Sequence, residues 1–219
     1  MKRNIVQCLS LIFLLTIVFG CSQAPKELPY LGNKETVEKL VDGKMVVDTL
    51  YHKIPDFEFI SQDSVKLTQE FVAGKIYIAD FFFTTCPTIC PKMKTQMLRI
   101  YEKYKDNPNV ILLSHSIDPR HDTPAVLKEF RSNLGIKGES WQMVTGDKAK
   151  IFEIGQKSYM VSAADDPTQP GGVVHSGAFI LVDKNRHIRG IYDGTVPAKV
   201  DNLMEDMEVL LNESSSNNK

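Results

Sequence analysis

The sequence predicts an α/β domain in which a central mixed sheet is flanked by helices, with an N-terminal β-hairpin extension. Two nearly continuous apolar segments, residues 75–83 and 110–117, are typical of strands buried on both faces of a sheet. Residues 91–104 between them carry apolar side chains at helical spacing, which predicts a β-α-β unit with a right-handed crossover. Helix and strand patterns continue to alternate after this unit, as expected of an α/β domain.

Length and composition suit one globular domain with short extensions at both ends. The chain has 219 residues, of which 42% are hydrophobic and 24% are charged. Its formal net charge of −1 gives no indication of nucleic-acid binding. We expect four parts: a lipoprotein signal peptide at 1–21, a tether and hairpin extension at 22–50, the folded domain at 51–213 and a disordered tail at 214–219.

The first residues have the pattern of a secretory signal peptide. Lys2 and Arg3 precede an apolar segment from Leu9 to Phe19, which is shorter than the roughly 20 residues that a transmembrane helix needs. Gly20 before Cys21 is typical of a bacterial lipobox, which predicts that Cys21 is lipidated and anchors the chain. An ordinary cleaved signal and an uncleaved anchor are the alternatives. Each places the domain outside the cytoplasm, and the lipobox predicts an anchor in the cell membrane with the domain facing the periplasm or the cell exterior.

Turn and capping signals place the remaining elements. Residues 22–31, with two prolines, predict a tether that holds the domain off the membrane. Asp42-Gly43 within the alternating segment 40–47 predicts a hairpin. Asp122-Thr123-Pro124 predicts a helix start with a capping side chain and a proline at the first helical position. The other expected elements are a strand at 54–59, a helix end near 134, a strand at 141–144, a helix at 147–159, a loop at 163–172, an antiparallel pair at 173–182 and 188–192, and a helix at 199–211. This order is that of a thioredoxin-like fold.

Only two of the four cysteines belong to the predicted folded part. Cys8 lies in the signal peptide and Cys21 at the anchor, which leaves Cys86 and Cys90. This pair follows a buried strand and opens a helix, whose N-terminus lowers the pKa of a nearby thiol. At positions i and i+4 the two cysteines are expected on one helical face, where they can form a disulfide or share a metal ion.

Three interpretations of the pair remain open at this point. A structural disulfide closes a loop of only a few residues and adds little stability. A dithiol oxidoreductase would use Cys86 as the attacking sulfur and Cys90 as the resolving one, but such enzymes normally have two residues between the cysteines and a proline before the facing strand, where this chain has His175. A soft-metal site is the third interpretation, because two thiolates and an imidazole suit Cu(I), and mixed ligands of this kind also hold Cu(II).

Three blocks in order resemble the Sco/SenC family of cytochrome c oxidase assembly factors, in its bacterial lipoprotein form. The blocks are Phe82–Pro91, Ser116–Pro124 and His175–Asp183, and the likeness spans about 54–211. The resemblance implies a copper site formed by Cys86, Cys90 and His175 in a metallochaperone that is not a turnover enzyme. It also implies delivery of copper to the dinuclear copper centre of cytochrome c oxidase, or reduction of that centre's cysteines beforehand.

The implied partners are the copper-bearing oxidase subunit or another copper acceptor, a thiol reductant and the membrane, and the chain is expected to be a monomer. Many members carry an acidic residue where this chain has Thr88 or Ile89, and aspartate where it has Val174. Lost negative charge at these positions can alter copper affinity or partner docking.

Some other polar and sulfur-containing residues have simpler explanations. Asp118 and Asp122 could assist metal transfer, but a turn and a helix start also explain them. Met93 and Met97 could be auxiliary copper ligands, although methionine at helical spacing usually fills a core. The remaining histidines are expected to be solvent-facing or locally hydrogen-bonded: His52, His115, His121 and His187.

Overall fold

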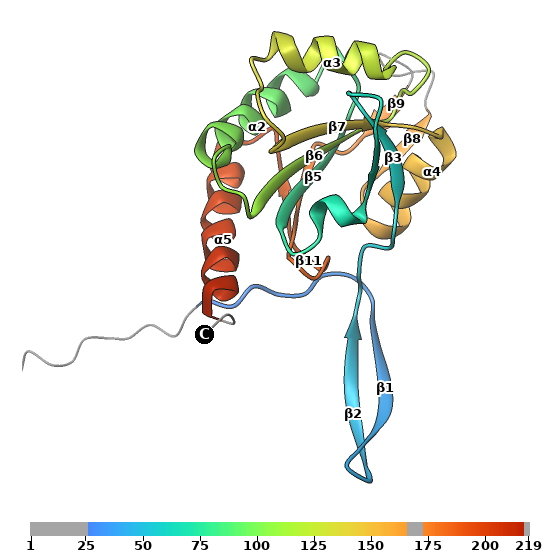
Figure 1. Ribbon diagram of the computed structural model, residues 1–219, viewed down its shortest axis with the longest axis vertical. Coiled ribbons are helices and arrows are strands. Elements are labelled where there is room, and N and C mark those ends of the chain that lie inside the picture. Colours follow the sequence, from blue (N-terminus) through green and yellow to red (C-terminus); the bar gives the residue numbers. More distant parts are fainter. Residues whose placement is uncertain (1–25, 166–172, 217–219) are drawn as a thin grey trace, which may run out of the picture.

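The computed structural model describes the backbone of residues 26–165 and 173–216, and the side chains of residues 26–162 and 176–213. The predicted signal peptide and Cys21 lie outside the described residues. Within the described part, a seven-stranded mixed sheet is flanked by helices, and a two-stranded hairpin extends away from it (Figure 1). The predicted fold class and hairpin extension are therefore confirmed.

The sheet has the strand order β11-β10-β5-β6-β7-β3-β4. Its strands are β3 (Glu58–Ser61), β4 (Lys66–Thr68), β5 (Ile76–Phe82), β6 (Val110–Ser116), β7 (Trp141–Thr145), β10 (Ala178–Val182) and β11 (Ile188–Asp193). The central strands β5, β6 and β7 are parallel, and the others pair antiparallel to their neighbours. Every residue of β5 and β6 is buried, as their apolar sequences predict.

Helices cover both faces of the sheet. Helix α2 (Cys90–Tyr104) and helix α5 (Pro197–Ser216) lie together on one side (Figure 1), where the Tyr104 hydroxyl donates to the carbonyl oxygen of Met204 over 3.1 Å. Helix α4 (Lys148–Glu153) and the π-helical turn η3 (Ile154–Ser158) cover the other side. A 3₁₀ turn, η2 (Gln69–Val72), follows β4.

Capping residues begin two of the helices as predicted. Helix α3 (Pro124–Asn133) starts with Thr123, whose side chain accepts a hydrogen bond from the Val126 amide, and with Pro124 at the first helical position. Asp147 caps α4 by accepting from the Lys150 amide.

Among the strands that the structure describes, the two strands of the hairpin pair only with each other. Strands β1 (Lys34–Val41) and β2 (Lys44–Tyr51) form their own two-stranded sheet, connected by Asp42 and Gly43 at φ values of 51° and 75°. A left-handed two-residue turn of this kind matches the strand twist of a tight hairpin. Figure 1 shows the hairpin projecting far from the body of the domain, and it is longer than the sequence predicts.

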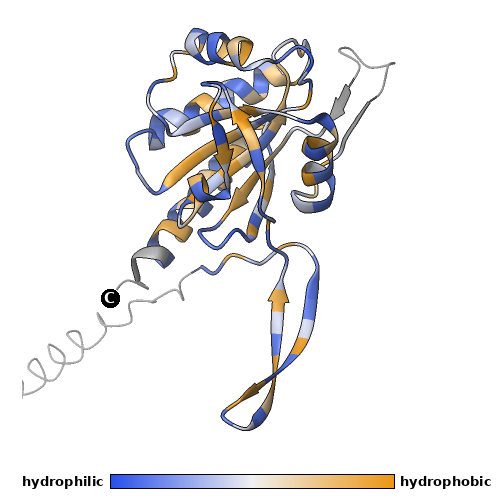
Figure 2. Ribbon diagram, turned by 45° about the vertical axis from the view of Figure 1, so that its right-hand side comes forward, coloured by the Kyte–Doolittle hydropathy of each residue, from blue (hydrophilic) through white to orange (hydrophobic). Residues whose placement is uncertain are grey.

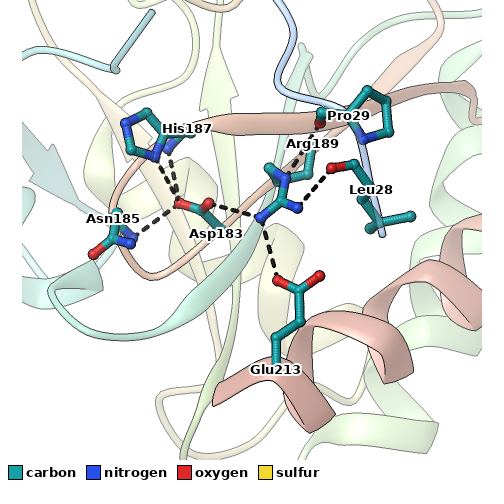
Figure 3. A network of polar contacts seen from close by, with 7 residues as sticks. All are labelled: Leu28, Pro29, Asp183, Asn185, His187, Arg189 and Glu213. Carbon is teal, nitrogen blue, oxygen red and sulfur yellow. Dashed lines mark hydrogen bonds and ion pairs between the residues drawn. The ribbon is translucent and has the colours of Figure 1, made fainter. Parts of the chain in front are cut away.

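The residues that precede the hairpin are docked on the domain, so the predicted tether is wrong from residue 26 onward. Leu28 is buried, and the Leu31 amide donates to the Ile188 carbonyl over 2.9 Å. The Arg189 guanidinium donates to the carbonyl oxygens of Leu28 and Pro29 (Figure 3). In a free tether these backbone groups would be hydrogen-bonded to water, whereas here they are hydrogen-bonded to residues of β11.

The same arginine joins the end of α5 to the sheet. Arg189 is 5% exposed and also pairs with Asp183 and Glu213 (Figure 3). Glu213 belongs to a part of α5 beyond the end predicted at 211, and the helix continues to Ser216. The ion pair with the buried arginine accounts for this additional helical turn.

The predicted strand at 173–182 is in fact two strands. Strand β9 (Val173–His175) pairs with β8 (Ala163–Asp165) in a separate small sheet, and only β10 joins the main sheet. Ser176 and Gly177 form the break, where the Gly177 carbonyl accepts from the Gly194 amide and the Ser176 amide donates to Ser162. The loop expected from residue 163 therefore begins with a strand, and the strand expected at 54–59 begins only at Glu58, after Pro55.

Candidate functional site

The two cysteines lie where β5 ends and α2 begins. Only Cys90 belongs to the helix, as its first residue, so the expectation of two cysteines on one helical face is wrong. Cys86 lies in the preceding loop, where its amide donates to the Phe83 carbonyl over 3.2 Å. This loop, rather than helical spacing, brings the sulfurs together.

Neither cysteine forms a disulfide in the described structure, and both are buried. Burial by itself raises the pKa of Cys86, but hydrogen bonds from the Cys90 side chain and from the Thr88 and Cys90 backbone outweigh it and leave this pKa below its ordinary value. Burial raises the pKa of Cys90 strongly, and its hydrogen bond to Cys86 adds to this effect. The pair therefore favours a Cys86 thiolate that accepts a hydrogen bond from the Cys90 thiol.

Asp122 supports the start of the cysteine loop. It is fully buried and accepts from the Thr84 amide at 3.1 Å, the Thr84 hydroxyl at 2.5 Å and the Ser116 hydroxyl at 2.6 Å. Because Thr123 caps α3, the helix-start explanation of Asp122 is wrong. The Asp118 amide donates to the Ser116 hydroxyl over 3.2 Å. Asp122 thus fixes the end of β5, from which Cys86 follows, against β6.

A buried carboxyl group that the sequence analysis did not single out lies beside the thiols. Asp80 of β5 lines a cavity of about 40 Å³ together with Cys86, Cys90 and Trp141. Burial raises the pKa of Asp80 to about 7, although a hydrogen bond with the Ser114 hydroxyl opposes this, and the Oδ1 atom has no hydrogen-bond partner. Asp80 is the only acidic residue in the apolar segment 75–83, and this was the signal that could have identified it.

The methionines of α2 belong to the core, as expected. Met93 and Met97 are 2% and 1% exposed, and both line the cavity beside the cysteines. They give the thiols an apolar and polarisable surrounding that excludes water.

The backbone of His175 belongs to β9, and its side chain lies outside the described residues. Two residues after His175, the chain lies beside the cysteine loop. The evidence is the position of Gly177, where an added Cβ atom would lie 3.8 Å from the Ile89 Cδ1 atom. Among the described side chains, no group of three or more histidine, cysteine, aspartate or glutamate residues is arranged to hold a metal ion. The described part of the site is thus the cysteine pair with Asp80 and Asp122 around it.

The side chains of the other four histidines have different surroundings. His115 is fully buried and stacks on Phe81 with ring centroids 4.8 Å apart, and its Nδ1 atom lies 3.3 Å from the Asp80 carbonyl oxygen. Of the two positions expected for this histidine, the solvent-facing one is wrong and the hydrogen-bonded one is confirmed. Burial lowers the pKa of His115 to about 4. The His52 Nε2 atom lies 2.7 Å from the Ser158 carbonyl oxygen, His187 contacts Asp183, and His121 is exposed.

None of the helices in the described ranges has the length and apolar character needed to cross a bilayer.

Comparisons with known proteins agree with this architecture. A curated relative, the SCO1 protein homolog of Bacillus subtilis (strain 168), is 31% identical over 168 residues, which cover 76% of this chain and 86% of the relative. The crystal structure of a SCO1/SenC family lipoprotein from Bacillus anthracis str. Ames is 27% identical, with a TM-score of 0.66 over 73% of this chain and 95% of that one. These likenesses support the thioredoxin-like expectation for the fold.

Two further solved structures bear on the chemistry of the site. BsSco, described as a member of the Sco family of cytochrome c oxidase assembly proteins with a disulfide switch, is 30% identical, with a TM-score of 0.64 over 73% of this chain and 93% of that one. ScoI of Bradyrhizobium japonicum was solved with copper bound and is 25% identical, with a TM-score of 0.54 over 69% of this chain and 97% of that one. The family model described as SCO1/SenC matches residues 48–212, three quarters of the chain. The chain therefore belongs to the SCO1/SenC family.

Proposed function

We propose that this protein is an extracytoplasmic copper metallochaperone that binds copper through Cys86, Cys90 and His175. It would pass the ion to the copper-bearing subunit of cytochrome c oxidase by ligand exchange. The observation that carries the proposal is the buried pair of hydrogen-bonded thiols at the N-terminus of α2, in which Cys86 has a lowered pKa. The copper-bound and oxidase-assembly relatives supply the choice of metal and acceptor.

The donor set suits copper better than a harder cation. Thiolates are soft ligands, and among the described residues that line the cavity beside the pair, Asp80 is the only one with a carboxyl group. Cys86 can offer a thiolate readily, whereas Cys90 must release its proton when the metal binds, because its pKa is raised. Binding should therefore weaken as the pH falls.

His175 is proposed as the third ligand because its strand leads directly to the cysteine loop. Strand β9 ends at His175, and Gly177 lies against Ile89 inside the Cys86–Cys90 loop. A ligand on a short strand outside the main sheet can move without disturbing the core, which suits an ion that must be loaded and released.

The anchor is proposed from the sequence and from one relative. Gly20-Cys21 after an apolar segment has the lipobox pattern, and the similar protein of Bacillus anthracis is a lipoprotein. Lipidation of Cys21 would hold the domain at the outer surface of the cell membrane.

A thiol–disulfide oxidoreductase is the second candidate, favoured by the contrasting pKa values of the two thiols. The Cys86 thiolate would attack a disulfide of the acceptor, and Cys90 would then resolve the mixed disulfide and give up its proton. The pair would end as a Cys86–Cys90 disulfide, and the acceptor would gain two electrons and two protons as two thiols. The disulfide switch reported for BsSco is consistent with such chemistry.

An anaerobic titration separates the two candidates. The reduced chain is titrated with Cu(I) and separately with Cu(II), and metal per chain and thiolate-to-copper absorption are measured in the wild type and in Cys86→Ala, Cys90→Ala and His175→Ala. The exposed His121→Ala is the matched control. The chaperone proposal expects one copper per chain, lost or strongly weakened in the three variants and retained in the control.

Copper binding that is indifferent to His175 would overturn the three-ligand site. If His175→Ala instead slowed thiol–disulfide exchange without weakening copper binding, the oxidoreductase would be the better account.

A further inference from the structure

The β1–β2 hairpin exposes apolar side chains far from the domain body. Every residue of the two strands is exposed except the half-buried Val37, and within residues 26–165 and 173–216 the strands pair only with each other. Leu40, Val47 and Met45 are 70%, 65% and 62% exposed. Figure 2 shows hydrophobic stretches, in orange, on the hairpin where it projects from the body of the domain. A two-stranded ribbon with no core of its own is at best marginally stable in water, so a surface that receives it would stabilise it.

The apolar residues lie on both faces of the ribbon. Residues directly opposite each other share a face, so Leu40 and Met45 lie on one side, with Val47 two residues further along the strand. Val41, Val46 and Leu50 lie on the other side. A folded partner normally covers one face of a strand pair, whereas a lipid interface surrounds an inserted tip. The distribution therefore favours lipid.

The chain outside the structure leads to the same surface. The described residues begin at Lys26, and the proposed lipid anchor at Cys21 precedes it by five residues, which span at most about 18 Å. Residues 26–31 are held on the domain by Arg189 and Ile188, so they cannot lengthen this tether. An anchored domain must then stay close to the bilayer.

The hairpin has the length to reach that bilayer. Eight residues per strand correspond to about 26 Å, which exceeds the tether by about 8 Å. Amphipathic elements at a membrane interface bury their apolar face about 5–10 Å deep. Figure 1 shows that the described chain begins at the end of the domain from which the hairpin projects.

From these observations we propose that the tip of the β1–β2 hairpin inserts into the lipid surface to which the chain is anchored. The proposal rests on the proposed anchor at Cys21 and is independent of copper binding. Strand β1 lies outside the family match at 48–212, so the hairpin adds a contact that the matched region does not contain.

Two membrane contacts would fix the orientation of the domain. The N-terminal segment docks on β11 and near the β10–β11 turn, where the Ile54 amide also donates to the Arg186 carbonyl. Gly177, beside the cysteine loop, precedes the opposite end of β10. With the hairpin in the membrane, Cys86 and Cys90 would face away from the bilayer toward an incoming partner.

The test uses the full lipidated chain in vesicles of phosphatidylethanolamine and phosphatidylglycerol, at less than one chain per vesicle. Part of the lipid carries brominated acyl chains, which quench tryptophan fluorescence only by contact. A Met45→Trp substitution reports on the tip, because Trp141 is buried and supplies a constant background. Val65→Trp, at a 61% exposed position on the domain body, is the matched control.

Flotation with the vesicles tests the anchor, and quenching tests the hairpin. We expect a blue shift and loss of most of the added fluorescence for Met45→Trp, but not for Val65→Trp. Adding Leu40→Ser and Val47→Ser to Met45→Trp should abolish the quenching. A chain that floats but leaves Met45→Trp unquenched would overturn the hairpin contact and keep the anchor, whereas a chain that does not float would overturn both. A blue shift without quenching that grows with protein concentration would indicate a second copy as the partner, and would also overturn the proposal.

Discussion

The buried carboxyl of Asp80 should make the domain less stable as the pH rises. Its pKa is raised by burial from 3.8 to about 7, so between these values the folded state holds a proton that the unfolded state has released. Stability therefore decreases with pH over this window, and it is highest below 3.8 as far as this group is concerned. At about 1.4 kcal/mol for each pH unit, the loss is about 4 kcal/mol at pH 8.

Asp80→Asn removes this titration while it keeps the size of the side chain. Relative to the wild type, the free energy of unfolding of the variant should increase between pH 4 and pH 8 by up to about 4 kcal/mol. For a urea m-value of about 2 kcal/mol/M, this corresponds to a relative midpoint shift of about 2 M. The change with pH is the informative quantity, because the new amide N–H groups can lack an acceptor and lower stability equally at every pH.

The assay is urea unfolding of the reduced, copper-free protein at pH 4, 6 and 8, followed by circular dichroism. Glu38→Gln, which removes an exposed carboxyl group on the hairpin, is the control and should follow the pH dependence of the wild type. If the difference between Asp80→Asn and the wild type were the same at all three pH values, Asp80 would not carry a raised pKa, and the inferred dry environment beside Cys90 would be wrong.

Three further predictions concern other buried groups. Burial lowers the pKa of His115 to about 4, so between pH 6.5 and pH 4 the unfolded state takes up a proton that the folded state does not. The contribution of this group to the free energy of unfolding is fully present above pH 6.5 and should decrease by about 3 kcal/mol as the pH falls to 4. Urea titrations of His115→Phe should no longer show this decrease. Asp122→Ala leaves the Thr84 amide and two hydroxyls without their acceptor, so we expect the free energy of unfolding to fall by about 2–3 kcal/mol. Alkylation of Cys86 by iodoacetamide should become faster, and an unchanged rate would refute the support that Asp122 gives to the loop. Arg189→Met leaves Asp183 buried without its ion pair, so we expect the free energy of unfolding to fall by about 3–5 kcal/mol and protease to cleave near Leu28. An N-terminal segment that stays protected from protease would contradict the docking seen in Figure 3.

Local patterns in the sequence predict the elements that carry the site. The apolar segments at 75–83 and 110–117 and the helical spacing at 91–104 are recognisable because burial on both faces or on one helical face imposes a period on the sequence. The Asp42-Gly43 hairpin and the Thr123-Pro124 helix start depend on backbone geometry within a few residues, and both are confirmed. The position of the two cysteines after β5 follows from the same local information.

Features that depend on distant contacts were decided only by the tertiary structure. Residues 26–31 resemble a free tether in composition. They dock because β11 places Arg189 where its guanidinium donates hydrogen bonds to two of their carbonyl oxygens. Asp122 lies 38 residues from Thr84 and meets it only when β5 and β6 pair in register. The isolated aspartate at position 80 is visible in the sequence, but its burial, which raises its pKa, depends on α2 and the neighbouring strands packing around it. Hydrophobic period is a local property of the chain, whereas burial of a polar group is set by whichever distant segments close over it.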